Sequence, residues 1–138
     1  MDSAQPLAVR LISAYVAAFN RDDVEGQLAV LAPDVVHDIN EGGTEIGIEA
    51  YRAFKAHMDA HYAERLEEVR VYGDDTGGAC EFIVRGRYLR TDGSLPPATG
   101  QAYAVRSGFF VDVSDGKISR ITSYYNLRKW CEAVVGDC

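Results

Sequence analysis

The chain has little of what marks a nucleic-acid-binding or membrane protein. Basic residues are scarce: 14 Lys and Arg stand against 21 Asp and Glu, for a formal net charge of −7 at pH 7. Binding to a phosphate backbone needs clustered cations. No apolar run approaches the roughly 18 residues of a membrane span. Asp2 precedes any basic residue and Arg10 interrupts the first apolar stretch, which is unlike a signal peptide. We therefore expect neither a nucleic acid nor a membrane as partner.

Cysteine is also rare. Cys80, Cys131 and Cys138 are odd in number and contain no CxxC spacing. This pattern indicates neither a disulfide framework nor a zinc site, and we expect no cofactor. A reduced, cytoplasmic location fits it best.

What is present describes one ordinary globular domain over residues 1–138. The chain is 47% hydrophobic and 25% charged, and 138 residues are enough for one core but few for two.

The first half of the chain has helical spacing. Apolar residues repeat at intervals of three and four along residues 6–20, which predicts a helix. Asp22 and Glu25 resemble a capping box that opens a second helix, and Pro33 should end it. Residues 35–40 alternate between apolar and polar side chains, as in a strand with His37 facing inward. Residues 48–62 have the spacing of a third helix.

The second half has the composition of strands. Residues 66–72, 79–89, 101–113 and 117–125 are rich in β-branched and aromatic side chains. Ser114, Asp115 and Gly116 signal a hairpin, and residues 91–100 form a polar loop that we expect beside a pocket mouth. This order predicts an α+β fold in which a curved antiparallel sheet forms a half cone covered by three helices. The space between sheet and helices is a natural apolar pocket.

Several segments carry a resemblance to a known family. The string YVAAFNRDDVEGQLAVLAPDVV, which begins at Tyr15, resembles the opening of the ketosteroid isomerases. Together with IEAYRAF, FIVRGRY and GFFVDVSDGKISRITSYYNL, the whole layout is similar to the nuclear transport factor 2-like superfamily. That superfamily includes SnoaL-like polyketide cyclases, and the branch described as ketosteroid isomerase-related looks most similar. One such cone hosts isomerases, cyclases, dehydratases, hydrolases and binding modules, so the fold does not fix the reaction.

The resemblance places Tyr15 on the tyrosine that stabilises the oxyanion in ketosteroid isomerase. The family's catalytic Asp position falls on Ile39. Asp38 lies one place earlier and should face away, unless a bulge turns it inward. The protonated Asp of the family falls on Ser107 or Gly108, so the isomerase triad is not intact. His37 is the alternative acid or base, because an imidazole titrates near neutral pH.

Strand alternation and helical spacing predict the remaining pocket wall. The expected ligand-binding residues are Phe54, Met58, Phe82, Val84, Tyr88, Tyr103, Ser107, Phe109, Ser123 and Tyr125. Such a wall suits a flat apolar or aromatic ligand. An ordinary hydrophobic core without a ligand would contain the same aromatic residues. Tyr15 and His37 could likewise have purely structural roles.

Two functions follow from this pattern. The first is a proton-transfer isomerase, cyclase or dehydratase that uses Tyr15 with His37 or Asp38. The alternative is a non-catalytic module that binds an apolar ligand or dimerises. Apolar residues at 102, 104, 110 and 124 on the outer sheet face predict a homodimer. His57 and His61 stand four residues apart on a helix, but we expect no metal there because the sequence shows no third ligand.

Overall fold

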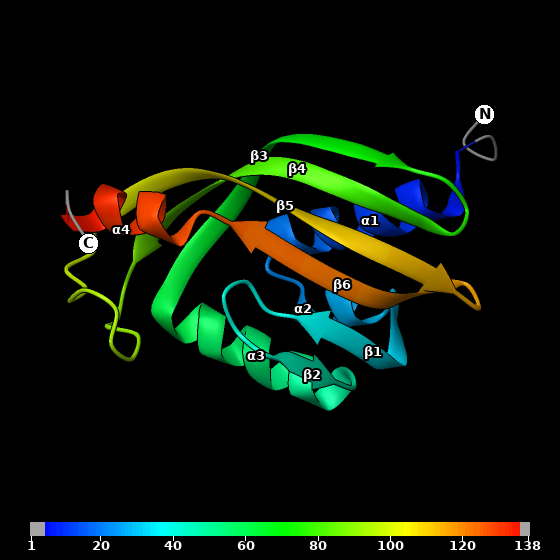
Figure 1. Ribbon diagram of the computed structural model, residues 1–138, viewed down its shortest axis with the longest axis horizontal. Helices are drawn as coiled ribbons and strands as arrows, with labels where there is room; N and C mark the ends of the chain where they lie inside the picture. Colours follow the sequence, from blue (N-terminus) through cyan, green and yellow to red (C-terminus); the bar gives the residue numbers. More distant parts are fainter. Residues whose placement is uncertain (1–4, 136–138) are drawn as a thin grey trace.

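The computed structural model describes residues 5–135. Two helices begin the chain, and two short strands and a third helix precede the long strands (Figure 1). In chain order the elements are α1 Leu7–Asn20, α2 Val24–Leu28, β1 Leu31–Asp38, β2 Thr44–Ile46, α3 Ile48–His61, β3 Tyr62–Gly73, β4 Gly77–Tyr88, β5 Ala102–Ser114, β6 Lys117–Tyr125 and α4 Leu127–Val135.

The strands form one curved sheet of six, in the order β2-β1-β6-β5-β4-β3. Neighbouring strands are antiparallel except β1 and β6, which are parallel. The predicted α+β cone is therefore confirmed, with one parallel pair that the sequence did not indicate. Figure 1 shows the long strands β3 to β6 arching over α3, while α1 lies against the sheet.

Two local predictions are wrong by a few residues. Asp23, and not Asp22, caps α2: its carboxylate accepts a hydrogen bond from the Gly26 amide at 2.9 Å. Asp22 instead takes a positive φ of 59° in the turn. Pro33 does not end the second helix but lies exposed inside β1, where the pairing with β6 is irregular.

Two clusters of buried residues make the core. The larger joins α1, α2 and α3 to the concave sheet face and includes Ile12, Val35 and Ile118. The smaller surrounds Trp130 of α4, a helix that the sequence pattern did not predict. Its ring meets Tyr88 edge-on at 4.8 Å, so α4 packs over one end of the sheet.

The cysteines differ from expectation. Cys80 is a free, buried thiol, whereas Cys131 is disulfide-bonded, which the cysteine spacing did not indicate. Within residues 5–135, none of the helices combines the length and the apolar character needed to cross a membrane.

Candidate functional site

A cavity of about 350 Å³ lies between the concave sheet face and helices α1, α3 and α4. Its walls are mostly aromatic and aliphatic, and its polar groups are few. This volume is within the range of small-molecule pockets in proteins. The predicted hollow of the cone therefore exists, and it contains both Tyr15 and His37 in its lining.

Tyr15 of α1 meets a second phenol inside the cavity. Its hydroxyl is hydrogen-bonded to that of Tyr51 on α3, and the two residues are only 5% and 3% exposed. Burial raises the pKa of Tyr15 to about 12 and that of Tyr51 well above its ordinary value. Both phenols therefore stay protonated at neutral pH. When Tyr51 donates to Tyr15, the Tyr15 proton is left to donate to a ligand oxygen, and the chain of two hydrogen bonds strengthens that donor.

His37 of β1 lies beside this pair. Its ring is 4.8 Å from the Tyr51 ring and 4.6 Å from the Phe54 ring, measured between centroids. The residue is 2% exposed, and its Nδ1 has no hydrogen-bond partner. Burial lowers the pKa of His37 to about 4, so the imidazole is neutral at physiological pH. An unpartnered buried nitrogen is costly, which makes His37 a group ready to bond to a ligand.

Asp38 does not line the cavity. Its carboxylate accepts hydrogen bonds from Arg120 at 2.7 Å and from Thr122 and Thr44 at 2.7 and 2.8 Å. These bonds lower its pKa to about 2. His37 and Asp38 pair in sequence with Ile121 and Thr122, so strand alternation is intact at this point of β1. The bulge that could have turned Asp38 inward is therefore absent there. We therefore remove Asp38 from the candidate site.

Most of the predicted wall lies where alternation placed it. The residues among those predicted that line the cavity are Phe54, Met58, Phe82, Val84, Ser107, Phe109, Ser123 and Tyr125. Tyr88 and Tyr103 do not. The Tyr88 ring stacks on Tyr62 at 5.5 Å and its hydroxyl donates to the Pro96 carbonyl at 2.7 Å, so it belongs to the cluster under α4.

A half-buried carboxyl group in the cavity wall was missed. Glu64 of β3 accepts a hydrogen bond from the Tyr103 hydroxyl at 2.6 Å, and burial raises its pKa above the ordinary value. The signal was available: Tyr62, Glu64 and Leu66 alternate on one face. Composition placed the start of this strand at Leu66, four residues too late, because α3 passes into β3 without a loop.

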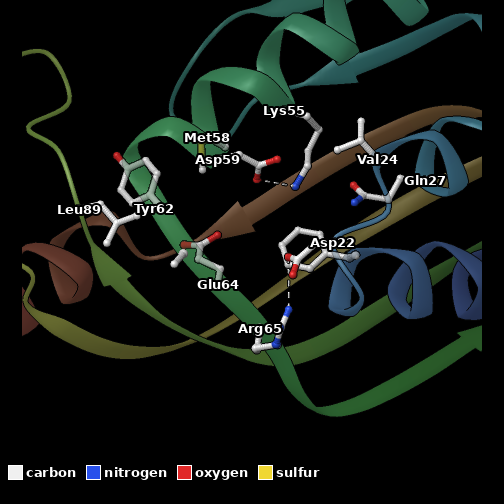
Figure 2. Close-up of a pocket in the computed structure, with 12 residues that line it drawn as sticks. Asp22, Val24, Gln27, Lys55, Met58, Asp59, Tyr62, Glu64, Arg65 and Leu89 are labelled. Carbon is white, nitrogen blue, oxygen red and sulfur yellow. Dashed lines mark hydrogen bonds and ion pairs between the residues drawn. The ribbon is translucent and has the colours of Figure 1, made fainter.

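A second hollow, of about 450 Å³, adjoins the cavity and shares Lys55, Met58 and Glu64 with it (Figure 2). Lys55 is unusual for a lysine because it is only 6% exposed. Its ammonium lies 4.1 Å from the centre of the Phe19 ring and 3.5 Å from an Asp59 oxygen. Figure 2 shows the Lys55–Asp59 pair on α3 across from Glu64. This side of the cavity therefore carries both charge signs, whereas the Tyr15 side carries only neutral donors and acceptors.

Known proteins share the fold described above. The family model for the SnoaL-like domain matches residues 12–121. None of the curated proteins matches the chain.

Solved structures match over nearly the whole chain. A crystal structure of a candidate polyketide cyclase from Pseudomonas putida KT2440 is 44% identical, with a TM-score of 0.90, covering 93% of this chain and 98% of that one. A nuclear transport factor 2-like protein of unknown function from Burkholderia pseudomallei K96243 shares the fold at 18% identity, with a TM-score of 0.81 and coverage of 95% and 99%. TerC, co-crystallised with polyporic acid, shares the fold at 22% identity, with a TM-score of 0.78 and coverage of 93% and 98%. The chain thus belongs to the SnoaL-like domain family and shares the fold of nuclear transport factor 2-like proteins.

Proposed function

We propose that the protein binds a flat aromatic or polycyclic small molecule in the cone cavity and moves a proton on it, as an isomerase, cyclase or dehydratase does. The observation that carries this proposal is the buried pair of Tyr15 and Tyr51 hydroxyls beside the unpartnered Nδ1 of His37. Two hydrogen-bond donors and a neutral imidazole on the uncharged side of the cavity are suited to a carbonyl that becomes an enolate.

The chemistry assigns one role to each group. The Tyr15 hydroxyl donates to the ligand oxygen, and the Tyr51 hydroxyl donates to the Tyr15 oxygen. His37 accepts the proton from the carbon next to the carbonyl. Burial disfavours the imidazolium, but the negative charge that develops on the nearby oxygen favours it, so proton transfer and oxyanion formation stabilise each other. His37 needs this stabilisation of its protonated form, because an imidazole of low pKa is a weak base.

Glu64 is the second candidate for the proton acceptor. Burial raises the pKa of the Glu64 carboxyl above its ordinary value, and a raised pKa makes a carboxylate a stronger base. Its hydrogen bond from Tyr103 fixes its orientation in the wall. Comparing His37 and Glu64 variants assigns the base.

Two neighbours support a small organic ligand. The 44% identical Pseudomonas putida protein is a candidate polyketide cyclase, and TerC was co-crystallised with polyporic acid. The aromatic lining of the cavity and its few hydrogen-bonding groups favour a planar, oxygen-bearing member of that class.

Deuterium exchange tests the proposal even while the natural product of the reaction is unidentified. A panel of aromatic and polycyclic ketones is incubated with the protein in deuterated water, and loss of the proton next to the carbonyl is followed by NMR. We expect exchange with the wild-type protein, and a large loss of exchange in Tyr15→Phe and in either His37→Asn or Glu64→Gln. Asp38→Asn is the matched control and should exchange like the wild type. Binding of the panel with no exchange above buffer would contradict catalysis and favour the alternative, a non-catalytic ligand-binding module.

We also propose a homodimer through the outer sheet face. Phe110 and Tyr124 are 58% and 57% exposed there, and their rings contact each other edge-on at 5.8 Å. Exposed aromatic residues in contact are typical of a protein–protein interface.

A cytoplasmic location remains a prediction from the sequence, and the disulfide bond at Cys131 argues for a less reducing compartment. Mass spectrometry of protein alkylated under denaturing conditions directly from its native cells decides the matter. Alkylation of all three cysteines supports the cytoplasm, and a retained disulfide opposes it.

A further inference from the structure

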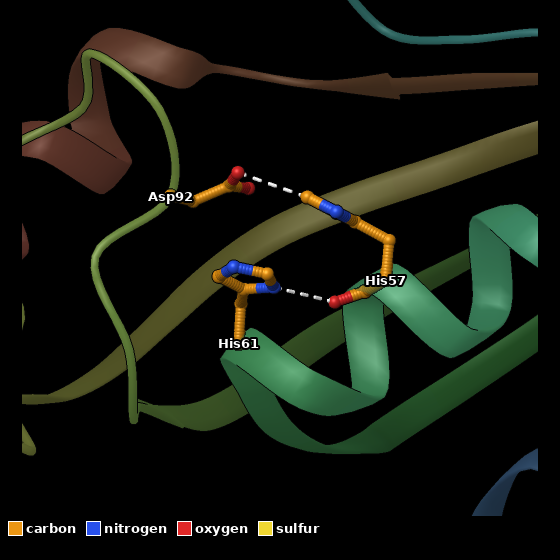
Figure 3. Close-up of side chains that lie close together, drawn as sticks. All are labelled: His57, His61 and Asp92. Carbon is orange, nitrogen blue, oxygen red and sulfur yellow. Dashed lines mark hydrogen bonds and ion pairs between the residues drawn. The ribbon is translucent and has the colours of Figure 1, made fainter.

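Three side chains with metal-ligand chemistry meet where the cavity opens to solvent. His57 and His61 lie on the last turn of α3, and Asp92 lies in the loop between β4 and β5 (Figure 3). One ligand atom from each residue lies within 4.8 Å of those of the other two. The His57 Nε2 is 2.9 Å from Asp92 Oδ1, and the two imidazole rings stack at 4.2 Å between centroids. Asp92 is the third ligand that the helical spacing of the two histidines could not reveal.

Two of the three ligands are each held by a further hydrogen bond, as in metal sites. The His61 Nδ1 lies 2.7 Å from the His57 backbone oxygen. A carbonyl oxygen only accepts, so Nδ1 carries the proton and Nε2 keeps the free lone pair that a metal needs. Asp92 Oδ2 accepts from the Tyr62 hydroxyl at 2.7 Å. The Asp92 amide donates to the Tyr88 hydroxyl at 3.0 Å, which ties the loop to the core.

The charge of the group also suits a cation. One oxygen of the Asp92 carboxyl group accepts from the Tyr62 hydroxyl, and the other lies against His57 Nε2, so an acidic side chain stands beside the two imidazoles. An ordinary ion pair needs only His57 and Asp92. It does not explain why the His61 side chain also lies beside these two residues.

The ligand types identify the class of ion. Two imidazole nitrogens and one carboxylate oxygen suit Zn²⁺ and its transition-metal neighbours, whereas Ca²⁺ and Mg²⁺ prefer oxygen ligands. Three protein ligands leave a fourth position for water or a ligand atom. His57 and Asp92 also line the cavity, so the cluster adjoins the space proposed for the ligand.

We propose that His57, His61 and Asp92 bind a divalent transition-metal ion, Zn²⁺ by preference, at the mouth of the cone cavity. Binding replaces the contact between His57 Nε2 and Asp92 Oδ1 with a bond from each of these atoms to the metal ion. This site does not depend on the proton-transfer function proposed above, because Tyr15, Tyr51 and His37 are not part of it.

Metal titration of the chelator-treated full chain tests the site. Zn²⁺ is titrated by calorimetry, and Co²⁺ is titrated with visible absorption as a probe of coordination. We expect one Zn²⁺ per chain and Co²⁺ bands of a low-coordinate site. His61→Ala and Asp92→Asn should each weaken Zn²⁺ binding at least tenfold. The amide at position 92 keeps an oxygen for the Tyr62 hydrogen bond, so loss of fold is not expected, and circular dichroism checks it.

The matched control is Asp59→Asn. Asp59 lies on α3 between the two histidines, but its carboxylate pairs with Lys55 and is not in the cluster. This variant removes the same charge close to the site without removing a ligand, so its Zn²⁺ affinity should stay within about threefold of the wild type. Equal affinities for Asp59→Asn and Asp92→Asn would overturn the proposal, as would the absence of wild-type binding at about 100 µM Zn²⁺.

Discussion

A double-mutant cycle on Tyr15 and Tyr51 tests the hydrogen bond between the two hydroxyls in the cavity wall. Tyr15→Phe removes one hydroxyl and leaves the other buried without its protein partner, and Tyr51→Phe does the reverse. A net hydrogen bond is worth about 1 kcal/mol, and a buried polar group left unpaired costs about 1–3 kcal/mol. We therefore expect each single variant to lose about 1–3 kcal/mol of unfolding free energy.

The double variant should lose much less than the sum of the two single losses. With both hydroxyls removed, no unpaired polar group remains between the rings, and paired deletions of this kind can be nearly neutral. We expect a coupling energy of at least about 1 kcal/mol between the two positions.

Equilibrium urea unfolding gives these free energies, with circular dichroism and the fluorescence of the single Trp130 as independent probes. Tyr72→Phe is the control, because the Tyr72 side chain is exposed on β3 and loss of its hydroxyl should change little. Losses that add within about 0.5 kcal/mol would refute a direct bond between the two phenols.

Three other perturbations separate the roles of His37, Asp38 and Phe110. Burial lowers the pKa of His37 from 6.5 to about 4, so the unfolded chain takes up a proton first, and stability should fall by up to about 3 kcal/mol as pH drops from 6.5 to 4. His37→Asn should flatten this part of a pH-dependent unfolding curve, and an unchanged slope would contradict a neutral buried imidazole. Asp38→Asn should lower the urea midpoint by weakening the bonds to Arg120 and Thr122, yet leave ligand affinity within twofold in a fluorescence titration. A large loss of affinity would return Asp38 to the site. Phe110→Glu should convert the proposed dimer into a monomer in light scattering after gel filtration, and a wild type that already runs as a monomer would refute the outer-face interface.

Periodicity was a good guide to which way side chains face. Alternation in β1 placed His37 inside and Asp38 outside, and helical spacing placed Tyr15 on the buried side of α1. Both inferences depend only on local geometry, because residues two apart in a strand and three or four apart in a helix share a face. The resemblance to the cone family supplied the rest of the fold.

Long-range partners could not be read from local spacing. Tyr51 lies on the same helical face as Phe54 and Met58, but nothing in its spacing shows that its hydroxyl meets Tyr15. Asp92 likewise reaches His57 only because hydrogen bonds and packing in the 89–101 loop turn it toward α3. Contacts of this kind are set by tertiary packing.

The helix α4 was missed for a different reason. At nine residues it is too short to be stable alone, and its stability comes from packing of Trp130 against the tyrosines of the smaller cluster. The apolar positions of this segment predict a helix only once it is known that the end of the sheet is open for a helix to pack against.

The most direct measurement is a crystal structure of the protein soaked with polyporic acid or with a ketone that passes the exchange screen. We predict ligand density in the cone cavity with one ligand oxygen within about 3.2 Å of the Tyr15 or Tyr51 hydroxyl and His37 in contact with the ring. A ligand bound elsewhere, or bound in the cavity with its oxygens turned away from both hydroxyls, would contradict the proposed site.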